Sequence, residues 1–326
     1  MKQLKFHGWT VVVFLLASVI YFSEVGYTQQ FPNRPVTVVV PKEAGGAHDV
    51  TARALASVAQ KYLGQPMYVE LKPGGGGAIG ADFVAKQAPD GYTVLFGDSG
   101  VNSAKPAESG RSKGPNDMEA VCVINFGMSP ILVRADAPFK TFKEFMDYAK
   151  AHPNELKYGS AGTASWNEMA WKLFEFKTGI RTRIVPYEGG GPALIALLGG
   201  HVDVTCTGVT ASISQIKAGK IRIIVFFKDK RPKSFPDIPI GKEFGVDVNN
   251  TMWKGMLVPK GTPRPVIEKL AMAFKKMTED KAVIQTIERS GDELDYLGPD
   301  EFSKMWRKEY EDQKEILKML KSKKAK

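Results

Sequence analysis

The sequence predicts an α/β fold built on parallel β-sheet, and three observations lead to this prediction. Val36–Val40 is a short β-branched run that is apolar on both faces, as a strand buried in a parallel sheet is. A glycine-containing loop and a helical stretch follow it, and this strand–loop–helix order is repeated up to Phe96. The 326 residues are enough for two α/β domains of ordinary size.

The first loop, Lys42–Asp49, has the composition of an anion-binding site. Gly45 and Gly46 allow a tight turn and expose backbone N–H groups. Asp49 is a candidate N-cap of the following helix, with Arg53 at i+4 on the same face. Free N–H groups and the positive end of the helix dipole then converge on the loop, which suits an anion. Helical spacing follows at Ala52, Leu55, Ala56 and Ala59.

The remaining chain alternates strand and helix patterns. The region Ser99–Asp117 is polar and rich in Gly, Pro and Lys, and it is predicted as a loop. Strands are predicted at Met67–Leu71, Tyr92–Phe96, Val121–Ile124, Ile131–Val133, Arg183–Val185, Val202–Cys206, Ile221–Phe226 and Met252–Val258. Helices are predicted at Ala78–Gln87, Phe142–His152, Trp166–Thr178, Ala193–Leu198, Ser212–Ala218, Lys281–Ser290 and Glu301–Lys318, with another introduced by Pro263 and Pro265.

Composition indicates a globular protein that does not bind nucleic acid. The chain is 43% hydrophobic and 25% charged, which excludes disorder, and its net charge is +10. Five lysines lie in the tail Lys318–Lys326, which is interpreted as a solvated end. No basic segment with interleaved aromatic residues accompanies them.

The N-terminus predicts export. Lys2 and Lys5 precede an apolar run over Trp9–Phe22, which is typical of a secretory signal and shorter than a membrane-spanning helix. We therefore expect a signal peptide over residues 1–28 and a periplasmic location. Because no good small-x-small cleavage site is present, an uncleaved N-terminal anchor stays open as the alternative. The absence of a cysteine near residue 20 excludes a lipoprotein anchor.

Cysteines and histidines do not predict a metal site. Cys122 and Cys206 lie in strand-like runs, and two buried thiols are favoured over a disulfide. The four histidines are scattered without ligand spacing. His48 is the only histidine in the first loop, where a surface position is favoured over a ligand contact.

A glycine motif offers an alternative function. Gly75–Gly80 matches G-x-G-x-x-G between a strand and a helix, and Asp98 follows at the end of the next strand. This pattern is compatible with a nicotinamide-dependent oxidoreductase. It stands in the second strand–helix unit, whereas the fingerprint normally occupies the first, and nicotinamide cofactors are scarce outside the cytoplasm. Ser99 ends a parallel strand, where open α/β sheets place ligand contacts.

An ordered set of segments resembles one known family. They are VVVPKEAGGAHDVTAR (38–53), ELKPGGGGAIGADFVAKQAPDGYTVLFGDSG (70–100), YGSAGTAS (158–165), VPYEGGGPALIALLGGHVD (185–203), AGKIRIIV (218–225) and GMLVPKGTPRPVI (255–267). The set looks like the substrate-binding proteins of tripartite tricarboxylate transporters, the extracytoplasmic solute receptors also called Bug proteins. The resemblance runs from about Phe31 to the C-terminus.

The resemblance implies a two-lobed periplasmic-binding-protein-like fold that closes on a small carboxylate. Each lobe would be a mostly parallel sheet flanked by helices, with residues 31–128 and 251–326 in the first lobe and 129–250 in the second. The loops Ala44–Asp49 and Ser160–Ser165 would hold the ligand, with Ser99, the Tyr187–Gly191 loop and Asp203 lining the cleft. The candidate ligand-binding residues are Lys42, Ala44, Gly45, Gly46, His48, Asp49, Ser99, Ser160, Thr163, Ser165, Trp166, Tyr187 and Asp203.

The resemblance also implies a non-enzymatic monomer without a cofactor or metal. It would bind a small organic acid and deliver it to the integral membrane subunits of a transporter. A sensory receptor with the same cleft but a different partner is the other alternative.

Several positions depart from the family pattern, so no specific ligand is carried over. Lys42 and Glu43 stand where relatives usually have an aromatic residue and a proline, and His48 stands where a small residue is usual. Trp166 and Glu168 replace a typical proline and histidine in the second loop. The Lys42 ammonium either extends to water or pairs with a second ligand carboxylate.

Export can be tested on the mature chain. We expect the protein in the periplasmic fraction, beginning between about Val25 and Phe31, because the apolar run ends shortly before. Fractionation followed by intact-mass measurement checks this. A full-length chain in the cytosolic fraction with Met1 retained would contradict it.

Overall fold

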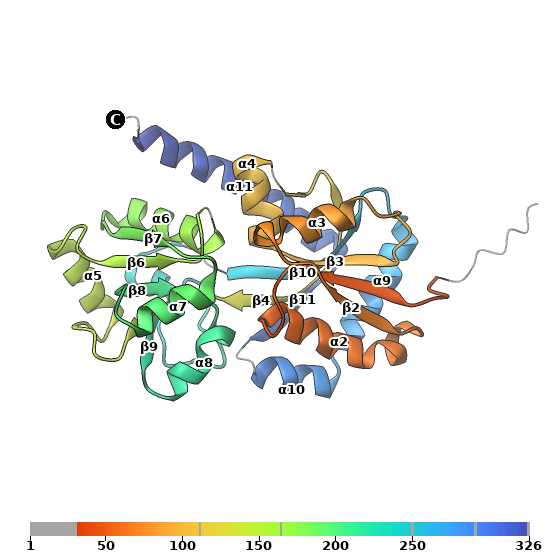
Figure 1. Ribbon diagram of the computed structural model, residues 1–326, viewed down its shortest axis with the longest axis horizontal. Helices are drawn as coiled ribbons and strands as arrows, with labels where there is room; N and C mark the ends of the chain where they lie inside the picture. Colours follow the sequence, from red (N-terminus) through yellow and green to blue (C-terminus); the bar gives the residue numbers. More distant parts are fainter. Residues whose placement is uncertain (1–30, 111, 164, 249–250, 290–291, 325–326) are drawn as a thin grey trace, which may run out of the picture. The chain divides into compact units, whose positions relative to one another are not determined.

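The computed structural model describes residues 31–110, 112–163, 165–248, 251–289 and 292–324, with side chains up to Lys318. The predicted signal peptide therefore lies outside the described residues. Residues from Arg34 onward form one unit of contacts that contains two separate β-sheets. Each sheet has helices packed against it (Figure 1).

The first sheet has the strand order β11-β4-β10-β3-β1-β2. Parallel pairing joins β1 to β2 and to β3, whereas β10 pairs antiparallel with β3 and β4, and β4 with β11. Its strands are β1 (Val36–Val40), β2 (Met67–Leu71), β3 (Thr93–Asp98), β4 (Met118–Met128), β10 (Thr251–Pro259) and β11 (Glu293–Leu297). Its helical elements are α2 (Ala47–Leu63), η1 (Gly75–Gly77), α3 (Ala78–Ala85), η2 (Gly100–Ala104), α4 (Lys105–Ser109), α9 (Arg264–Thr278), α10 (Lys281–Arg289) and α11 (Pro299–Lys324).

The second sheet has the strand order β7-β6-β8-β5-β9. Here β6 pairs parallel with β7 and β8, and β5 pairs antiparallel with β8 and β9. Its strands are β5 (Ile131–Arg134), β6 (Lys157–Ser160), β7 (Arg183–Pro186), β8 (Val204–Cys206) and β9 (Ile221–Val225). Its helical elements are α5 (Phe142–Ala151), α6 (Trp166–Thr178), α7 (Gly190–Leu198), α8 (Val209–Lys217) and η3 (Gly241–Phe244).

Both sheets are mixed rather than mostly parallel, which corrects the prediction. Val36–Val40 is buried along nearly its whole length, as predicted, but so is Thr251–Pro259, which runs antiparallel to both neighbours. Because both faces of these central strands are covered by helices, the apolar pattern is the same for either direction. The chain leaves the first sheet through β4 and returns to it through β10.

The predicted loop Ser99–Asp117 is partly helical, which is a second correction. The turn η2 continues into α4, with Pro106 in the first turn of α4, where proline is tolerated. The Asp98 carboxylate accepts the Val101 N–H at 2.8 Å and so holds the start of this segment. The glycine and proline content of this region predicts a loop. The helical turn forms because the Asp98 side chain accepts a backbone N–H at its start. Strands β6 and β11 were also absent from the prediction.

Each lobe has an aromatic core. In the second lobe the rings of Tyr158 and Trp171 stack with centroids 4.1 Å apart, beside Phe174. In the first lobe Trp253 and Phe302 pack edge to face with centroids 4.8 Å apart. Each such pair contributes about 0.5–1.5 kcal/mol beyond the burial of its area. Cys122 and Cys206 are separate buried thiols, as predicted.

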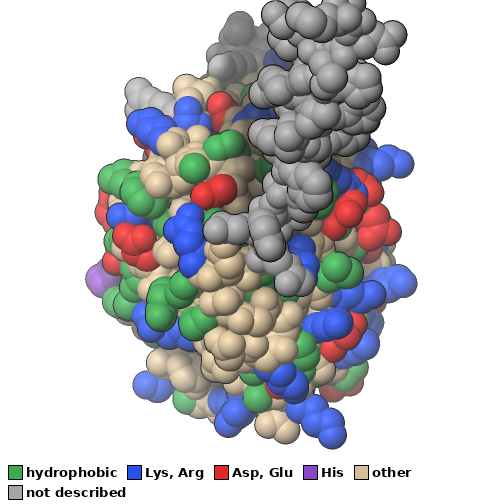
Figure 2. All heavy atoms as spheres, turned by 90° about the vertical axis from the view of Figure 1, so that its right-hand side faces the viewer, with side chains coloured by type: hydrophobic (Ala, Val, Ile, Leu, Met, Phe, Trp, Pro, Cys, Tyr) green, Lys and Arg blue, Asp and Glu red, His purple; other side chains and the backbone are tan. Residues whose placement is uncertain are grey.

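Basic side chains are interspersed with other side chains on one face of the protein. On the part of the face described in Figure 2, Lys and Arg are interspersed with Asp, Glu and apolar side chains instead of forming one patch. Many of the basic residues are in ion pairs on their own helix, such as Lys86 with Asp82 and Lys308 with Asp312. These pairs offset part of the positive charge locally.

A buried ion pair in the first sheet provides a stability test. Lys254 on β10 pairs with Asp292, both about 3% exposed, and the Asn125 amide donates to Asp292 at 3.1 Å. Lys254→Met should lower the free energy of unfolding by about 3–5 kcal/mol, because it leaves a buried carboxylate without its cation. Urea unfolding measures this loss. The double variant with Asp292→Leu should lose much less, and equal losses in the two variants would contradict the pairing.

Candidate functional site

The strand order of the first sheet has a switch point between β1 and β3, and we call the region outside the carboxyl ends of these strands the first crevice. These strands are parallel neighbours, but β1 continues through α2 to β2 on one side, whereas the chain after β3 proceeds to the other side. Ligands of open α/β sheets bind at such a switch point, at the carboxyl ends of the strands. The loop that begins at Lys42 follows β1, and Asp98 ends β3, so both predicted segments reach this crevice.

The first loop has a different cap from the one predicted. Gly46, in extended conformation, is the N-cap of α2, and among the described residues no side chain caps it. Asp49 lies in the first turn and accepts the Gly45 N–H at 2.8 Å and the Arg53 Nε–H at 2.7 Å. Gly45 has φ +75°, which favours glycine. The N–H of Gly45 is therefore used internally, while those of the first turn of α2 are left for a ligand.

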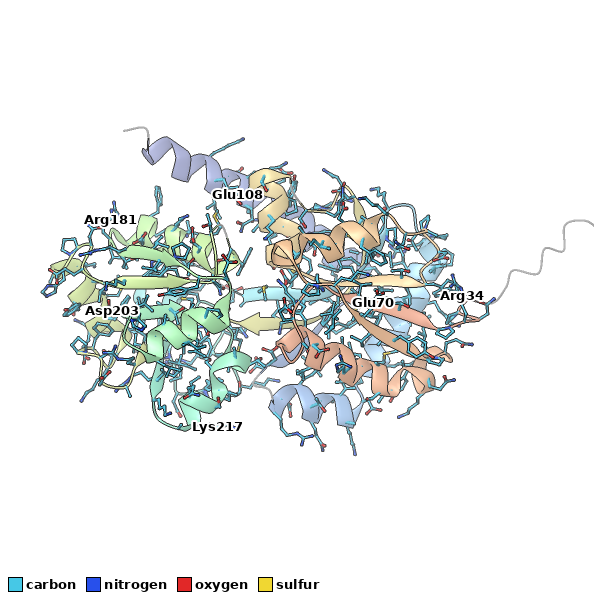
Figure 3. The ribbon with its side chains drawn as sticks, in the orientation of Figure 1. Arg34, Glu70, Glu108, Arg181, Asp203 and Lys217 are labelled. Carbon is cyan, nitrogen blue, oxygen red and sulfur yellow. The ribbon has the colours of Figure 1, made fainter. Side chains whose placement is uncertain are left out.

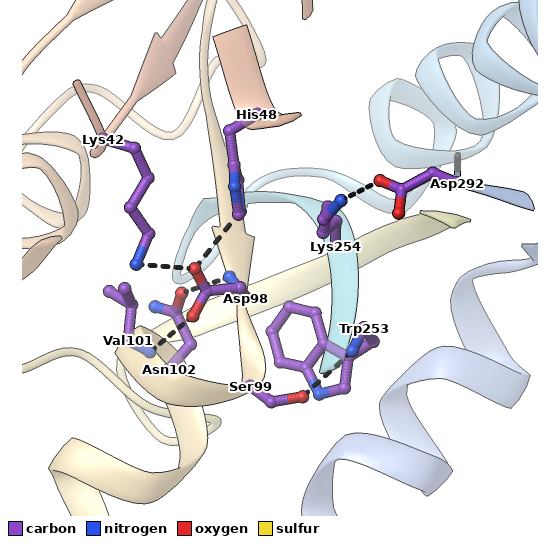
Figure 4. A network of polar contacts seen from close by, with 9 residues as sticks. All are labelled: Lys42, His48, Asp98, Ser99, Val101, Asn102, Trp253, Lys254 and Asp292. Atoms are coloured by element: carbon purple, nitrogen blue, oxygen red, sulfur yellow. Dashed lines mark hydrogen bonds and ion pairs between the residues drawn. The ribbon is translucent and has the colours of Figure 1, made fainter. Parts of the chain in front are cut away.

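Asp98 is the centre of a buried polar network (Figure 4). Its Oδ2 lies 2.9 Å from Lys42 Nζ and 3.2 Å from His48 Nε2, and its side chain is fully buried. Burial alone would raise the pKa of Asp98, but the charge of Lys42 and the hydrogen bond from His48 outweigh it and hold the pKa well below its usual range. Burial, the largest effect, lowers the pKa of His48, which is thus a neutral donor.

This network corrects one expectation and adds a partner to Lys42. His48 is 4% exposed and lies in α2 against Phe96, so the surface position favoured from the sequence is wrong. The Lys42 ammonium pairs with Asp98, a partner that the sequence did not suggest, while its side chain is 33% exposed. Asp98 was named from the sequence only for the alternative dinucleotide function, and its role as a counter-ion was not predicted. Its place at the carboxyl end of a strand, between two cationic candidates, was the available signal.

Ser99 is turned away from the crevice. Its hydroxyl accepts the Trp253 N–H at 3.1 Å and donates to Glu309 Oε2 at 3.3 Å, and the residue is fully buried. Trp253 Nε1 donates to the other oxygen of Glu309 at 2.8 Å. Burial raises the pKa of Glu309 to about 7 against the effect of these hydrogen bonds. Ser99 therefore ties β3, β10 and α11 together instead of presenting a hydroxyl to a ligand.

The glycine motif at 75–80 is used for packing. A side chain at Gly77 would lie 2.4 Å from Val101, and one at Gly80 would lie 2.8 Å from Pro41. Lys105 Nζ donates to the Gly75 carbonyl at 2.7 Å and covers the position next to Gly76. Asp98, which a dinucleotide site would need for a ribose, is enclosed in its own network. The glycines are therefore explained without a pyrophosphate.

A second crevice lies between β6 and β8, at the switch point of the second sheet. The Ser160–Ser165 loop follows β6, and Ser165 caps α6 by accepting the Glu168 N–H at 3.3 Å. The Ser160 hydroxyl donates to Glu168 Oε2 at 2.7 Å, and Lys172 pairs with the other oxygen of Glu168. Ser160 and Glu168 are buried and stabilise the conformation of the loop through their hydrogen bond. Thr163 is exposed on the loop.

The remaining second-lobe candidates separate into two groups. Tyr187 lies beside the Ser160–Ser165 loop, with its N–H donated to the Ser160 carbonyl at 3.1 Å. Asp203 does not join it: this residue precedes β8 and accepts the Lys157 N–H at 2.8 Å, at the amino end of the parallel strands (Figure 3). Trp166 is 8% exposed and packs with Gln313 of α11 around a small void.

Among the described residues, no group of three or more His, Cys, Asp and Glu side chains is arranged to hold a metal ion. In the same part of the chain, none of the helices is both long and apolar enough to cross a bilayer. The arrangement that the structure does offer is a pair of topological switch points, one in each sheet, each bordered by a helix N-terminus and a loop of small residues.

Comparison with known proteins agrees with this arrangement. The model of the tripartite tricarboxylate transporter family receptors (TctC) matches residues 51–321. A UPF0065 protein in the gbd 5' region of Cupriavidus necator is 32% identical over 291 residues, covering 89% of both chains. The protein BugT of Bordetella pertussis is 31% identical over 271 residues, covering 80% of this chain and 81% of BugT.

Solved structures show the same fold. MatC from Rhodopseudomonas palustris with bound malate is 30% identical, with a TM-score of 0.75 over 88% of this chain and 99% of MatC. The periplasmic binding protein BugD is 30% identical, with a TM-score of 0.76 over 89% of this chain and 98% of BugD. A Rhodopseudomonas palustris protein with adipate is 27% identical, with a TM-score of 0.79 over 88% of this chain and 97% of that chain.

Fold and site together define a two-lobed solute receptor of the periplasmic-binding-protein type, which confirms the predicted fold class. The chain belongs to the tripartite tricarboxylate transporter receptor (TctC) family, which includes the Bug proteins and whose receptors are periplasmic. The resemblance seen in the sequence is thereby confirmed.

Glu309 predicts a pH dependence of stability. Its pKa is about 7 in the folded protein, against an ordinary value of 4.5. Between these values the folded state binds more protons than the unfolded state. The stabilisation is thus complete below about pH 4.5 and is lost as the pH rises to about 7, by at most ~1.4 kcal/mol per pH unit. Urea unfolding of Glu309→Gln should lack this component, whereas Glu301→Gln, at an exposed position of α11, should retain it. The same slope in all three proteins would contradict the raised pKa.

Proposed function

We propose that this receptor binds a small organic acid between its two lobes and delivers it to the integral membrane subunits of a tripartite-type transporter. The observation that carries the proposal is the pairing of two crevices in one chain. The uncapped N-terminus of α2 borders the first crevice, and the N-terminus of α6, with the Ser160–Ser165 loop, borders the second. N–H groups at helix starts and the positive end of the dipole favour a carboxylate.

The relatives support this ligand class. MatC was solved with malate and another relative with adipate, and both are small carboxylates. We place the lobe boundaries after residue 128 and before residue 251, because β4 ends at Met128 and β10 begins at Thr251. The ligand-binding residues of this proposal are those that border the crevices: Lys42, Ala44, Gly46, Thr163, Ser165 and Tyr187. Asp98, His48, Ser99 and Ser160 support them from inside.

The proposed role is binding without catalysis, by a monomer exported through an N-terminal signal. The ionisable groups around the end of β3 are paired with the protein itself: the buried Asp98 with Lys42 and His48, and the partly exposed Glu309 of α11 with Ser99 and Trp253. Such groups hold the walls of the crevice. A general acid or base must lie within hydrogen-bond distance of the substrate atom that it protonates or deprotonates, whereas these groups are bonded to the protein.

Ligand binding can be tested by thermal melting with a panel of small mono-, di- and tricarboxylates. At 100 times its Kd, a bound acid adds about 2.7 kcal/mol to the free energy of unfolding, which is enough to raise the melting temperature measurably. We expect at least one acid in the panel to do so. A shift with NAD or NADP only would overturn the proposal in favour of a dinucleotide enzyme.

Gly46 is the residue at which the mechanism can be tested. Its backbone is extended, and an added Cβ would meet only the Glu43 carbonyl at 3.5 Å, so Gly46→Val fits the folded loop. The valine would project at the start of α2 and should weaken binding of the best acid at least tenfold, measured by calorimetry. Gly298→Val is the matched control, since a Cβ there meets nothing within 4 Å. Undiminished binding by Gly46→Val would contradict a backbone cradle at α2.

A further inference from the structure

We propose that Lys42, anchored from inside by Asp98, is the residue that makes this receptor select acids with a second carboxylate. This inference rests on the proposed function and identifies the ligand class of the same site. The position of Lys42 is the first argument. It directly follows β1, and Asp98 ends the neighbouring parallel strand β3, so the pair occupies the switch point of the first sheet.

The Asp98 carboxylate fixes where the ammonium lies. One oxygen accepts the Val101 N–H at 2.8 Å, and the other lies 2.9 Å from Lys42 Nζ. A fully buried carboxylate held in this way has a single orientation, and it holds the end of a side chain that would otherwise be mobile. An ammonium has three N–H donors, and a single ion-pair partner such as Asp98 does not occupy all of them, so donors are left for a ligand. The lysine side chain is 33% exposed, which leaves it within reach of the crevice.

The charged groups around the first loop leave N–H donors for an anion. Lys42 and Lys105 both lie near the mouth of the first loop, and Asp98 is the one carboxylate that the ion pairs of the described residues give Lys42. His48 supplies a donor to Asp98 and no charge. Lys105 donates to the Gly75 carbonyl, which does not cancel its charge. Because Asp98 balances Lys42 and Glu108 lies near Lys105, the attraction for an anion comes from the free N–H donors of Lys42 and from the α2 N-terminus, not from a surplus of charge.

Monocarboxylates and dicarboxylates change the environment of the Lys42 ammonium differently, and this difference gives the selectivity. A single carboxylate can bind at the helix start, and its apolar tail would then displace water from Lys42 and offer no acceptor in return. A second carboxylate would replace that water with a charge-assisted hydrogen bond. The preference therefore has two sources, a hydrogen bond that only the dicarboxylate forms and a desolvation cost that only the monocarboxylate bears.

The test compares pairs of acids with equal carbon number: succinate with butyrate, glutarate with valerate, and adipate with hexanoate. Isothermal calorimetry gives the ratio of the two affinities in each pair. For the unmodified protein we expect a ratio of at least tenfold in favour of the dicarboxylate in the pair that fits best. The double variant Lys42→Met with Asp98→Asn removes both charges and keeps the interior neutral, and it should reduce the ratio to about threefold or less. Lys42→Arg should retain most of the ratio.

Lys72 provides the matched control. It follows β2 at the same edge of the same sheet, is 27% exposed and pairs with Glu70 at 2.7 Å. Lys72→Met with Glu70→Gln should leave the ratio unchanged. An unchanged ratio in the Lys42 variant, or an equal fall in both double variants, would overturn the role of Lys42 and leave the receptor function intact. Failure of every acid to bind the unmodified protein would overturn both. If the Lys42 double variant does not fold, loss of the ratio in Lys42→Gln is the supporting result, and its retention the contradicting one.

Discussion

The structure depends on one carboxylate that is buried at the carboxyl end of β3. Asp98 must stay ionised in a place without water, and such a charge is tolerated only when it is paired and hydrogen-bonded. Lys42, His48 and the Val101 N–H meet this requirement, and each comes from a different segment. Their convergence fixes the loop after β1, the first turn of α2 and the turn η2 relative to one another.

The consequences extend from this network to the C-terminal helix. The turn that Asp98 holds contains Asn102, whose carbonyl accepts the Trp306 Nε1–H at 3.0 Å and whose side chain donates to the Lys113 carbonyl at 2.7 Å. Ser99, directly after Asp98, reaches Glu309 of α11 and the backbone of Trp253. Helix α11 in turn packs on α6 of the second lobe around Trp166. The base of the crevice is therefore a rigid polar layer, and the exposed loop above it, with Ala44 and Gly46, is the part that is free to meet a ligand.

Most of the fold could be predicted from the sequence, because the periodicity of its strands and helices is strong. The β-branched run Val36–Val40 and the apolar spacing of the helices predict these elements without knowledge of their neighbours in the fold, and burial in the core stabilises the same structures. The direction of β10 could not be predicted, since its apolar residues are covered on both faces in either orientation. The sequence identified the two loops of the candidate site, whose role in binding stays a proposal. His48, Ser99 and Asp203 were misplaced because their partners, Asp98, Glu309 and Lys157, are distant in sequence or were not recognised as candidates.

The central claim is that one small acid is held at two switch points at once. The most direct measurement is a crystal structure of the protein with the acid that raises its melting temperature most. The account predicts a carboxylate within hydrogen-bond distance of the N–H groups at the start of α2, with the same ligand contacting the Ser160–Ser165 loop. A ligand seated on one lobe alone, or at the glycine loop Gly75–Gly80, would contradict it.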